Sequence, residues 1–328
     1  MDDEFEFGTA AGPTGRSKAV NTLNDLDARE WLRTTKSIWY ENLTDLQVPA
    51  LEAIAAALRQ TVGDEATEKI LGQVLDSILV SKPGPRDKLK ALHPATFPET
   101  DVERLIRFFT KEGEQVLDPF VGSGSTLVAA RHSGRGSLGI ELIPRCAEIA
   151  EQRANSQLCM FDSPTVEAQV RLGDARTVLR GLPDESYDLV LTSPPYWSML
   201  NKPADHKMTA ERVSRNLPTN YSSSEVDLAN IETYQDFLDQ LGEVFAQCVR
   251  VLKPMKYIVV IVSDFRHKSQ FFMYHADVGR MLERLGMTLA GVTILVQDSK
   301  TLYPYGMPHT FVSNIHHQYV VVARKLGR

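Results

Sequence analysis

Val116-Leu-Asp-Pro-Phe-Val-Gly-Ser-Gly-Ser-Thr126 is the stretch of sequence that decides the fold. Its apolar start predicts a buried strand, and its glycines predict a tight turn that opens a helix. Gly122 and Gly124 let the backbone approach a ligand closely, and the following helix presents free N–H groups. A tight turn without a ligand is the simpler interpretation. The loop lacks both the GxGxxG pattern of dinucleotide-binding folds and the GK[ST] ending of a P-loop.

Strands and helices alternate after this loop. Such alternation predicts an α/β fold with a doubly wound, mostly parallel sheet, here of seven strands. The expected strands are Gln115–Asp118, Ser137–Glu141, Gln169–Leu172, Tyr187–Thr192, Tyr257–Ser263, Thr288–Val296 and Gln318–Arg324. The expected helices run from the glycine loop to about His132, over Pro144–Asn155, over Tyr234–Leu252 and over Ala276–Leu285.

The first 85 residues show a different pattern. Residues 1–25 are rich in Gly, Thr, Asp and Asn, which predicts a flexible arm. Apolar residues predict a short amphipathic helix from Asp27 to about Tyr40 and two helices within residues 48–80, before the linker signal Lys82-Pro-Gly-Pro85. We therefore expect a flexible arm (1–25), a helical appendage (26–85) and an α/β domain (86–328).

Acidic residues follow three successive strands of the predicted sheet. Asp118 ends the first strand, Glu141 ends the second, and Asp174 follows the third. Ligands bind at the carboxyl edge of such sheets, so three acids in order favour a binding site over helix caps alone. Asp118 suits an amino group of a ligand, Glu141 suits two ribose hydroxyls, and Asp174 suits an adenine amino group.

Asp188-Leu-Val-Leu-Thr-Ser-Pro-Pro-Tyr-Trp197 runs from a buried strand into two prolines and two aromatic residues. Prolines fix φ and donate no N–H, so we expect a rigid segment whose unpaired carbonyls accept hydrogen bonds from an exocyclic amine. Ser193 can accept another, and Tyr196 offers a ring on which a base can stack. Such acceptors restore the amine lone pair for attack on a sulfonium methyl, and a duplex base must be flipped out to reach them. A rigid turn or a proline-rich ligand motif is the alternative.

These motifs resemble those of amino-methylating DNA methyltransferases, over about residues 85–325. The resemblance implies a Rossmann-like methyltransferase fold, S-adenosylmethionine as cofactor and double-stranded DNA as partner. It favours the N4 atom of cytosine as the target, because those members mostly carry Ser before Pro-Pro, as at Ser193. The implied catalytic residues are Ser193, Pro194, Pro195 and Tyr196. The implied cofactor-binding residues are His93, Pro94, Ala95, Thr96 and Phe97, which resemble the segment covering the methionine end of the cofactor, and Asp118, Pro119, Phe120, Gly122, Ser123, Gly124, Thr126, Glu141, Leu142, Asp174 and Ala175.

Residues 198–232 form a segment that is too long for an ordinary connection. We interpret it as a target-recognition insertion, which residues 297–315 could join, rather than as a disordered insertion. Ser263–Arg266 ends the fifth strand and either borders the flipped base or caps a helix. The expected DNA contacts are Trp197, Lys202, Lys207, Arg212, Arg215 and Arg266.

The composition excludes several classes of protein. The net charge is −6, which by itself argues mildly against nucleic-acid binding, although two local basic sets (residues 82–90 and 250–268) could form a basic face. The three cysteines form no CxxC pair, and no metal site is expected. The acidic start and the lack of a long apolar run predict no signal peptide and no membrane span.

The cysteine content fits a reducing cytoplasm, and the resemblance implies a prokaryotic protein that is associated with the nucleoid through DNA. A companion restriction endonuclease and a homodimer are both compatible with the sequence. Three other functions stay open: adenine-N6 methylation of DNA, amine methylation of an RNA base, and a non-catalytic binder that keeps the nucleotide pocket.

Overall fold

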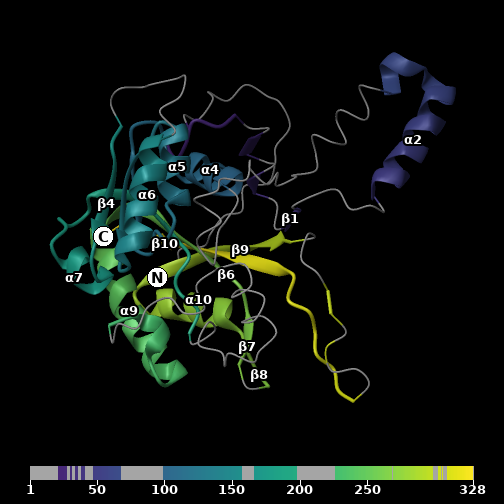
Figure 1. Cartoon of the computed structure of the whole chain (residues 1–328). Helices are drawn as coiled ribbons and strands as arrows, with labels where there is room; N and C mark the ends of the chain where they lie inside the picture. Colours follow the sequence, from purple (N-terminus) through teal and green to yellow (C-terminus); the bar gives the residue numbers. More distant parts are fainter. Residues whose placement is uncertain are drawn as a thin grey trace, which may run out of the picture.

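The computed structural model describes residues 21–27, 30–31, 34–35, 38–40, 47–67, 99–156, 166–197, 226–267, 269–297, 302–303, 305 and 309–327. Their strands form one large sheet and one small hairpin (Figure 1). The strands are β1 (Ile38–Tyr40), β2 (Gln115–Asp118), β3 (Gly136–Glu141), β4 (Ala168–Leu172), β5 (Tyr187–Thr192), β6 (Leu252–Val262), β7 (Phe265–His267), β8 (Gln270–Phe272), β9 (Met287–Val296) and β10 (His317–Lys325). The helices are α2 (Gln47–Val62), α4 (Glu99–Phe109), α5 (Ser125–His132), α6 (Pro144–Ser156), α7 (Ala175–Arg180), the 3-10 helix η2 (Leu228–Asn230), α9 (Tyr234–Val251) and α10 (Tyr274–Arg284).

The strand order in the large sheet is β1-β9-β10-β6-β5-β2-β3-β4. The seven predicted strands are all present, and β1 adds an eighth at one edge. Strands β4, β3, β2, β5 and β6 pair in parallel, whereas β10 is antiparallel to both β6 and β9. The carboxyl ends of β2, β3, β4, β5, β6 and β9 therefore meet at one edge, which we call the carboxyl edge. The chain order reverses between β2 and β5, and ligands bind at such a switch point.

Helices cover both faces of the sheet (Figure 1). Leu189 and Leu191 of β5 pack in a core with α4 and α5, whereas Val190 between them packs in a core with α7, α9 and α10. Successive side chains of a strand point to opposite faces, so a strand covered on both faces reads as continuously apolar. This explains the unbroken apolar run that ends β6, residues 257–262.

The helix predicted from Asp27 to Tyr40 is wrong over its last three residues. Ile38, Trp39 and Tyr40 form β1 and pair in parallel with β9. β-branched and aromatic side chains favour strands, and the open edge of β9 offers unpaired backbone groups. Trp31, in the helical part of this segment, packs against Phe108 of α4 with ring centroids 4.9 Å apart.

The predicted appendage is described only in part. Helix α2 confirms the first of its two long helices and lies apart from the sheet in Figure 1. The second helix lies mostly outside the described residues, as do residues 1–20 of the flexible arm and the linker signal Lys82–Pro85. No helix among the described residues is long and apolar enough to cross a membrane.

Three cations of the basic set within residues 250–268 form ion pairs and so are not part of a free cationic face. The Lys253 ammonium lies 2.9 Å from the buried Asp188 carboxylate, and Lys256 lies 2.5 Å from Glu114 and 3.4 Å from Asp188. Arg250 pairs with Asp184. Because these cations stand near the start of β6, at the edge opposite the carboxyl edge, their charges are used in holding strands and loops together.

Candidate functional site

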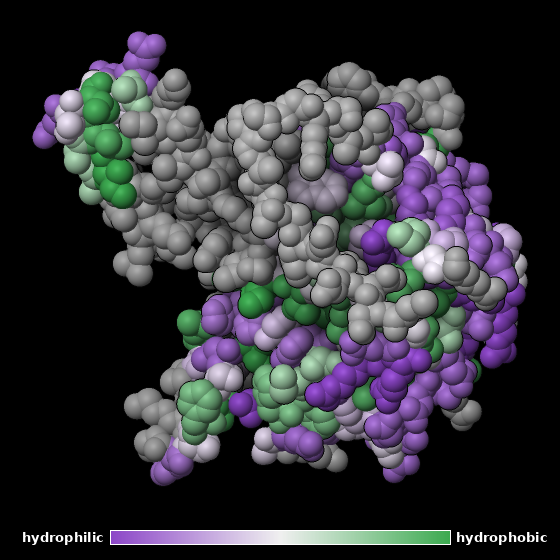
Figure 2. Space-filling view, turned by 180° about the vertical axis from the view of Figure 1, so that it is seen from behind, coloured by the Kyte–Doolittle hydropathy of each residue, from purple (hydrophilic) through white to green (hydrophobic). Residues whose placement is uncertain are grey.

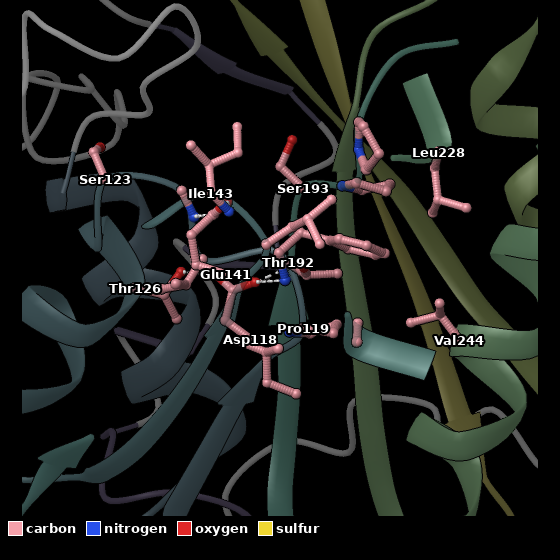
Figure 3. A pocket seen from close by; sticks show the side chains of 18 of the residues that line it. Asp118, Pro119, Ser123, Thr126, Glu141, Ile143, Thr192, Ser193, Leu228 and Val244 are labelled. Atoms are coloured by element: carbon pink, nitrogen blue, oxygen red, sulfur yellow. Dashed lines mark hydrogen bonds between the residues drawn. The ribbon is translucent and has the colours of Figure 1, made fainter. Parts of the chain in front are cut away.

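A cavity that opens to solvent lies at the carboxyl edge. The ends of β2, β3 and β5 and the residues directly after β4 line it. Figure 3 shows residues from the β2 and β3 side at one wall, Ser193 at the end of β5, and side chains from η2 and α9 at the opposite wall. The labelled residues are Asp118, Pro119, Ser123, Thr126, Glu141, Ile143, Thr192, Ser193, Leu228 and Val244.

Asp118 connects the glycine loop to β5. Its buried carboxylate accepts hydrogen bonds from the hydroxyls of Thr126 and Thr192, each at 2.6 Å, and from the Phe120 N–H at 3.0 Å. Burial raises the pKa of Asp118 to about 6, although these three bonds counteract the shift. The strand-end acid therefore organises the loop and also lines the cavity.

The two glycines of the loop, Gly122 and Gly124, differ in what surrounds them. Gly122 and Gly124 both adopt positive φ, 53° and 84°, which side chains disfavour. A Cβ on Gly124 would also lie 2.9 Å from the Cα of Ala150 in α6, so a side chain there would push α5 and α6 apart. Gly122 instead borders the cavity, and its N–H donates to Glu141 at 2.9 Å.

Glu141 ends β3 and is held by the backbone around it. One carboxylate oxygen accepts from the Gly122 N–H and the other accepts from the Ile143 N–H at 2.8 Å. Burial raises the pKa of Glu141 to about 7, and the neighbouring Asp118 charge adds to the shift. The structure thus holds this carboxylate at the cavity wall, and its contact with ribose hydroxyls stays a prediction.

Asp174 has the cap role that the sequence analysis weighed as its alternative. Its carboxylate accepts from the Arg176 N–H at 2.9 Å and so caps α7. The Arg176 guanidinium also lies 2.6 Å from the same carboxylate. Asp174 still borders the cavity, together with Ala175. Its contact with an adenine amino group stays a prediction, because the backbone N–H and the guanidinium of Arg176 already donate to both carboxylate oxygens.

The segment Ser193–Tyr196 lines the cavity next to Asp118 and Glu141. Ser193 is half-buried and Pro194 is buried. The expectation of unpaired carbonyls is wrong for Pro195, because its oxygen accepts from the Tyr274 hydroxyl at 3.1 Å. That bond ties the motif to α10, so Ser193 and Pro194 are left as the positions that can offer acceptors to a ligand.

Tyr196 is anchored at its hydroxyl end. The Ser263 N–H donates to this oxygen at 2.8 Å, and the Gln318 side chain also bonds to it. Burial raises the pKa of Tyr196 to about 12, so the phenol stays protonated. Asp264, the next residue after Ser263, accepts from the backbone N–H of His275 in α10 at 3.3 Å and contacts its ring nitrogen at 2.7 Å. The Ser263–Arg266 segment therefore both supports the site and binds the start of a helix.

The sequence predicted a DNA contact for Trp197, but its side chain is not placed to make one. Its side chain is buried, and its indole N–H donates to the Ile231 carbonyl at 2.8 Å. The ring packs against Tyr234 and Phe272. An apolar ring with one polar atom is well satisfied by such a site, so Trp197 belongs to the core.

The sequence analysis missed Arg153, a buried cation behind the glycine loop. Its guanidinium bonds to the Ser123 carbonyl, lies 3.3 Å from the Ser123 hydroxyl, and pairs with Glu99 at the start of α4. Arg153 thereby joins α6, α4 and the loop that lines the cavity. An arginine in a helix that reads as amphipathic carries no sequence signal of this role.

Several predicted site residues lie outside the described part of the chain. These are the cofactor-covering residues His93, Pro94, Ala95, Thr96 and Phe97 and the DNA-contacting residues Lys202, Lys207, Arg212 and Arg215. Arg266 is described: its guanidinium lies 5.1 Å from the centroid of the Phe271 ring, and its contact with DNA stays a prediction. No cluster of metal-binding side chains is found in the described ranges.

The chemistry of the cavity fits a nucleoside that carries positive charge. Three carboxylates stand at its wall, from Asp118, Glu141 and Asp174, among apolar side chains such as Phe120 and Val244. The Ser125 hydroxyl is buried beside it with no hydrogen-bond partner among the described residues, so it can bond to a ligand. S-adenosylmethionine has the matching groups, namely an ammonium, a sulfonium, ribose hydroxyls and an adenine.

Comparison with known proteins decides the family. The family model described as DNA methylase, of the N6/N4 type, matches residues 12–152 and 187–325. The chain belongs to this family of amino-methylating DNA methylases. The family is S-adenosylmethionine-dependent, and the match extends well before residue 85, where the resemblance of the motifs began. It omits residues 153–186, which contain β4, Asp174 and α7.

Individual methylase relatives match over shorter stretches. The type II methyltransferase M.HpaI of Haemophilus parainfluenzae is 39% identical over 77 residues, which are 24% of this chain and 24% of the relative. The putative methylase YubD of Escherichia coli (strain K12) is 49% identical over 61 residues, 19% of this chain and 27% of the relative. The matched stretches thus span about a quarter of these curated relatives. A putative DNA modification methylase of Thermus thermophilus, TTHA0409, is 26% identical with a TM-score of 0.33, covering 48% of this chain and 53% of that chain.

Proposed function

We propose that this methylase transfers a methyl group from S-adenosylmethionine to an exocyclic amino group of a flipped-out base in a specific short sequence of double-stranded DNA. The observation that carries the proposal is the position of Ser193-Pro194-Pro195-Tyr196, which lines the same cavity as Asp118 and Glu141. The residues proposed to bind the cofactor and those proposed to accept from an amine would thereby meet at the switch point of the sheet.

Cofactor binding is assigned to the β2, β3 and β4 side of the cavity. Asp118 would attract the ammonium, Glu141 would accept from the ribose hydroxyls, and the Ser125 hydroxyl is free to bond. Arg153 would act as a positioning residue, because it holds the Ser123 carbonyl from behind the loop.

The proposed target is the N4 amino group of cytosine, with the N6 amino group of adenine as the alternative. The support is Ser193, which stands where the cytosine-N4 members of the family mostly carry serine. The extruded base would lie against the Tyr196 ring, whose edge-on neighbours Phe265 and Tyr274 hold it in place.

Bound S-adenosylmethionine supplies an electrophilic methyl group. The Ser193 hydroxyl and the Pro194 carbonyl would accept hydrogen bonds from the amine and so keep its lone pair directed into the cavity. The base nitrogen would bond to the methyl carbon as the methyl–sulfur bond breaks, the sulfur would keep that bond's electron pair as a neutral thioether, and the amine would then lose one proton to solvent. No general base is required before the transfer.

Cofactor binding should weaken as the pH falls from 8 to 6. The free protein holds protons on Glu141 below about pH 7 and on Asp118 below about pH 6, and a ligand that needs both carboxylates ionised must displace them. We expect roughly a tenfold loss of affinity over this range, with proton release on binding. Calorimetry in buffers of different ionisation enthalpy measures both the affinity and the number of protons released. The Glu141→Gln variant should no longer show the change in affinity near pH 7.

The same shifts make an independent prediction for the stability of the free protein. Both carboxyls stay protonated in the folded chain at pH values where the unfolded chain, with ordinary pKa values near 4, has lost those protons. The folded state therefore binds more protons than the unfolded state, and the contribution of the two carboxyl groups to the free energy of unfolding falls as the pH rises from about 4 to 7.

If the affinity for S-adenosylmethionine did not change between pH 6 and pH 8, the carboxylates of Asp118 and Glu141 would not be acceptors for the cofactor.

The methylated base can be identified by mass spectrometry of DNA from cells that express the protein. We expect N4-methylcytosine in the wild type and its absence in a Ser193→Ala, Pro194→Ala double variant with unchanged cofactor binding. A rise in N6-methyladenine alone would refute the base assignment and leave the chemistry intact. Transfer of labelled methyl to RNA and not to DNA would refute DNA as the substrate.

The cellular setting follows from this activity as a further part of the proposal. We place the protein with DNA in a prokaryotic cytoplasm, where it could protect sites from a companion restriction endonuclease or mark DNA without one, as a monomer or a homodimer. Sequencing that reports base and context together would give the recognition sequence.

A further inference from the structure

The exposed aromatic side chains are not spread evenly over this molecule. Four are found among the described residues: Phe271, Tyr303, Tyr305 and Phe311. Phe271 belongs to β8, in the hairpin that follows β6, and the other three lie between β9 and β10. Because β6 and β9 both end at the carboxyl edge, all four rings stand at the edge that contains the cavity.

The three rings between β9 and β10 belong to a structured projection. We call residues 302–303, 305 and 309–316 the aromatic arm; in Figure 1 its residues 309–316 lead into the start of β10, and in Figure 2 it projects at the lower left. The Gln297 N–H donates to the His316 carbonyl at 2.7 Å, and this hydrogen bond joins the two ends of the arm next to the sheet. The Asn314 side chain accepts from the Tyr303 N–H at 3.0 Å and donates to the Tyr303 carbonyl at 2.8 Å. The two sides of the arm are thus held together before any partner binds.

The arm offers rings to a partner and carries no negative charge. Phe311 is 86% exposed, and Leu302 is 61% exposed. The stretch from Ser299 to His317 contains no Asp or Glu, in a chain whose net charge is −6. An acid-free projection with bare apolar side chains is suited to a polyanion with stacked bases, because phenylalanine and leucine side chains can wedge between base steps and aromatic rings can stack on bases.

We propose that the aromatic arm inserts Phe311 into the DNA beside the flipped base. This inference rests on the proposed function. Extruding a base breaks its stacking and pairing, and a ring that replaces the lost stacking lowers the cost of extrusion. Phe311 is thus a residue for opening the duplex, distinct from Ser193 and Tyr196, which hold the base afterwards.

The test compares Phe311→Ala with a matched control, Leu326→Ala. Leu326 is also exposed, at 50%, but follows the end of the antiparallel β10 and so stands at the opposite edge of the sheet. The substrates are two oligonucleotide duplexes that contain the sequence methylated by the wild type, one fully paired and one with a mismatch at the target base. Methyl transfer is measured by single turnover with saturating S-adenosylmethionine.

We expect Phe311→Ala to slow transfer on the paired duplex by roughly 10-fold to 100-fold, the range expected for a lost stacking contact. The mismatched duplex, which is already open, should lose less than about threefold. Leu326→Ala should match the wild type on both substrates. Equal rates for Phe311→Ala and wild type on the paired duplex, or equal losses on both duplexes, would overturn the proposal.

Two other outcomes are informative. If the arm instead joins two copies of the chain, Phe311→Ala will change the sedimentation coefficient of the free protein, and this would also overturn the proposal. If the wild type methylates neither duplex, the proposed function itself fails. Because wild-type transfer is measured in the same experiment, failure of the arm and failure of the enzyme are told apart.

Discussion

Replacing Asp118 with alanine is expected to abolish measurable binding of S-adenosylmethionine, with a loss in affinity of at least about 100-fold. The substitution removes the acceptor for Thr126, Thr192 and the Phe120 N–H at once. Each buried donor left without an acceptor costs about 1–3 kcal/mol. We therefore also expect the thermal unfolding temperature to fall, and calorimetry of cofactor binding should be done well below it.

The Asp118→Asn variant separates charge from hydrogen bonding. Asparagine keeps one acceptor oxygen, and a threonine hydroxyl can turn to accept from its amide, so the loop should keep its shape. If the carboxylate charge attracts the cofactor ammonium, this variant will still bind the cofactor at least about tenfold more weakly than the wild type. Affinity equal to the wild type would make Asp118 a purely structural residue. DNA affinity, measured in the absence of cofactor, should survive in the Asp118→Asn protein.

Replacing Tyr196 with alanine should reduce the rate of methyl transfer about 100-fold while cofactor affinity changes by less than about threefold. The ring is the proposed stacking surface for the base, and such stacking is worth about 1–3 kcal/mol per base. Its removal also leaves a space beside Phe265 and Tyr274, so the base loses orientation as well as contact. Single-turnover transfer and calorimetry of cofactor binding together give the two quantities.

Tyr196→Phe is the matched control for that substitution. It keeps the ring and removes only the oxygen that bonds to the Ser263 N–H and the Gln318 side chain. We expect a loss of less than about tenfold in transfer, because a neutral hydrogen bond contributes about 1 kcal/mol. An effect as large as that of Tyr196→Ala would mean that the hydroxyl, and not the ring, is what the reaction needs.

The sheet could be predicted from sequence because periodicity and turn residues report on burial. Strand β6 is apolar on both faces, and Gln115–Asp118 leads directly into a glycine turn, so both positions follow from local pattern. The start of β1 could not be found in this way. Ile38, Trp39 and Tyr40 pair with residues more than 250 positions away, and no local signal distinguishes an edge strand of three residues from the end of a helix.

The location of the site and the types of residue in it could be predicted from the sequence, but not every contact that these residues make. Strand-end acids and the two prolines mark the carboxyl edge, which fixes where Asp118, Glu141 and Ser193 meet. Whether such an acid also caps a helix depends on the backbone that follows it: Asp174 does so because α7 begins directly after it and the backbone N–H of Arg176 points to its carboxylate. Trp197 follows Tyr196 in the sequence and was predicted to contact DNA, but its ring is packed against Tyr234 and Phe272 in the core. The boundary at residue 85 and the recognition insertion stay predictions.

Asp118 carries one consequence beyond the cofactor. A single carboxylate fixes Thr126 on the loop that would hold the methyl donor and Thr192 at the start of the motif that would hold the base. Any ligand that changes the charge or the bonding of this group alters both halves of the site. On the proposed function, any effect of the methyl donor on DNA affinity would be matched by an equal effect of DNA on donor affinity. Asp118 would then be the residue that couples the two binding events.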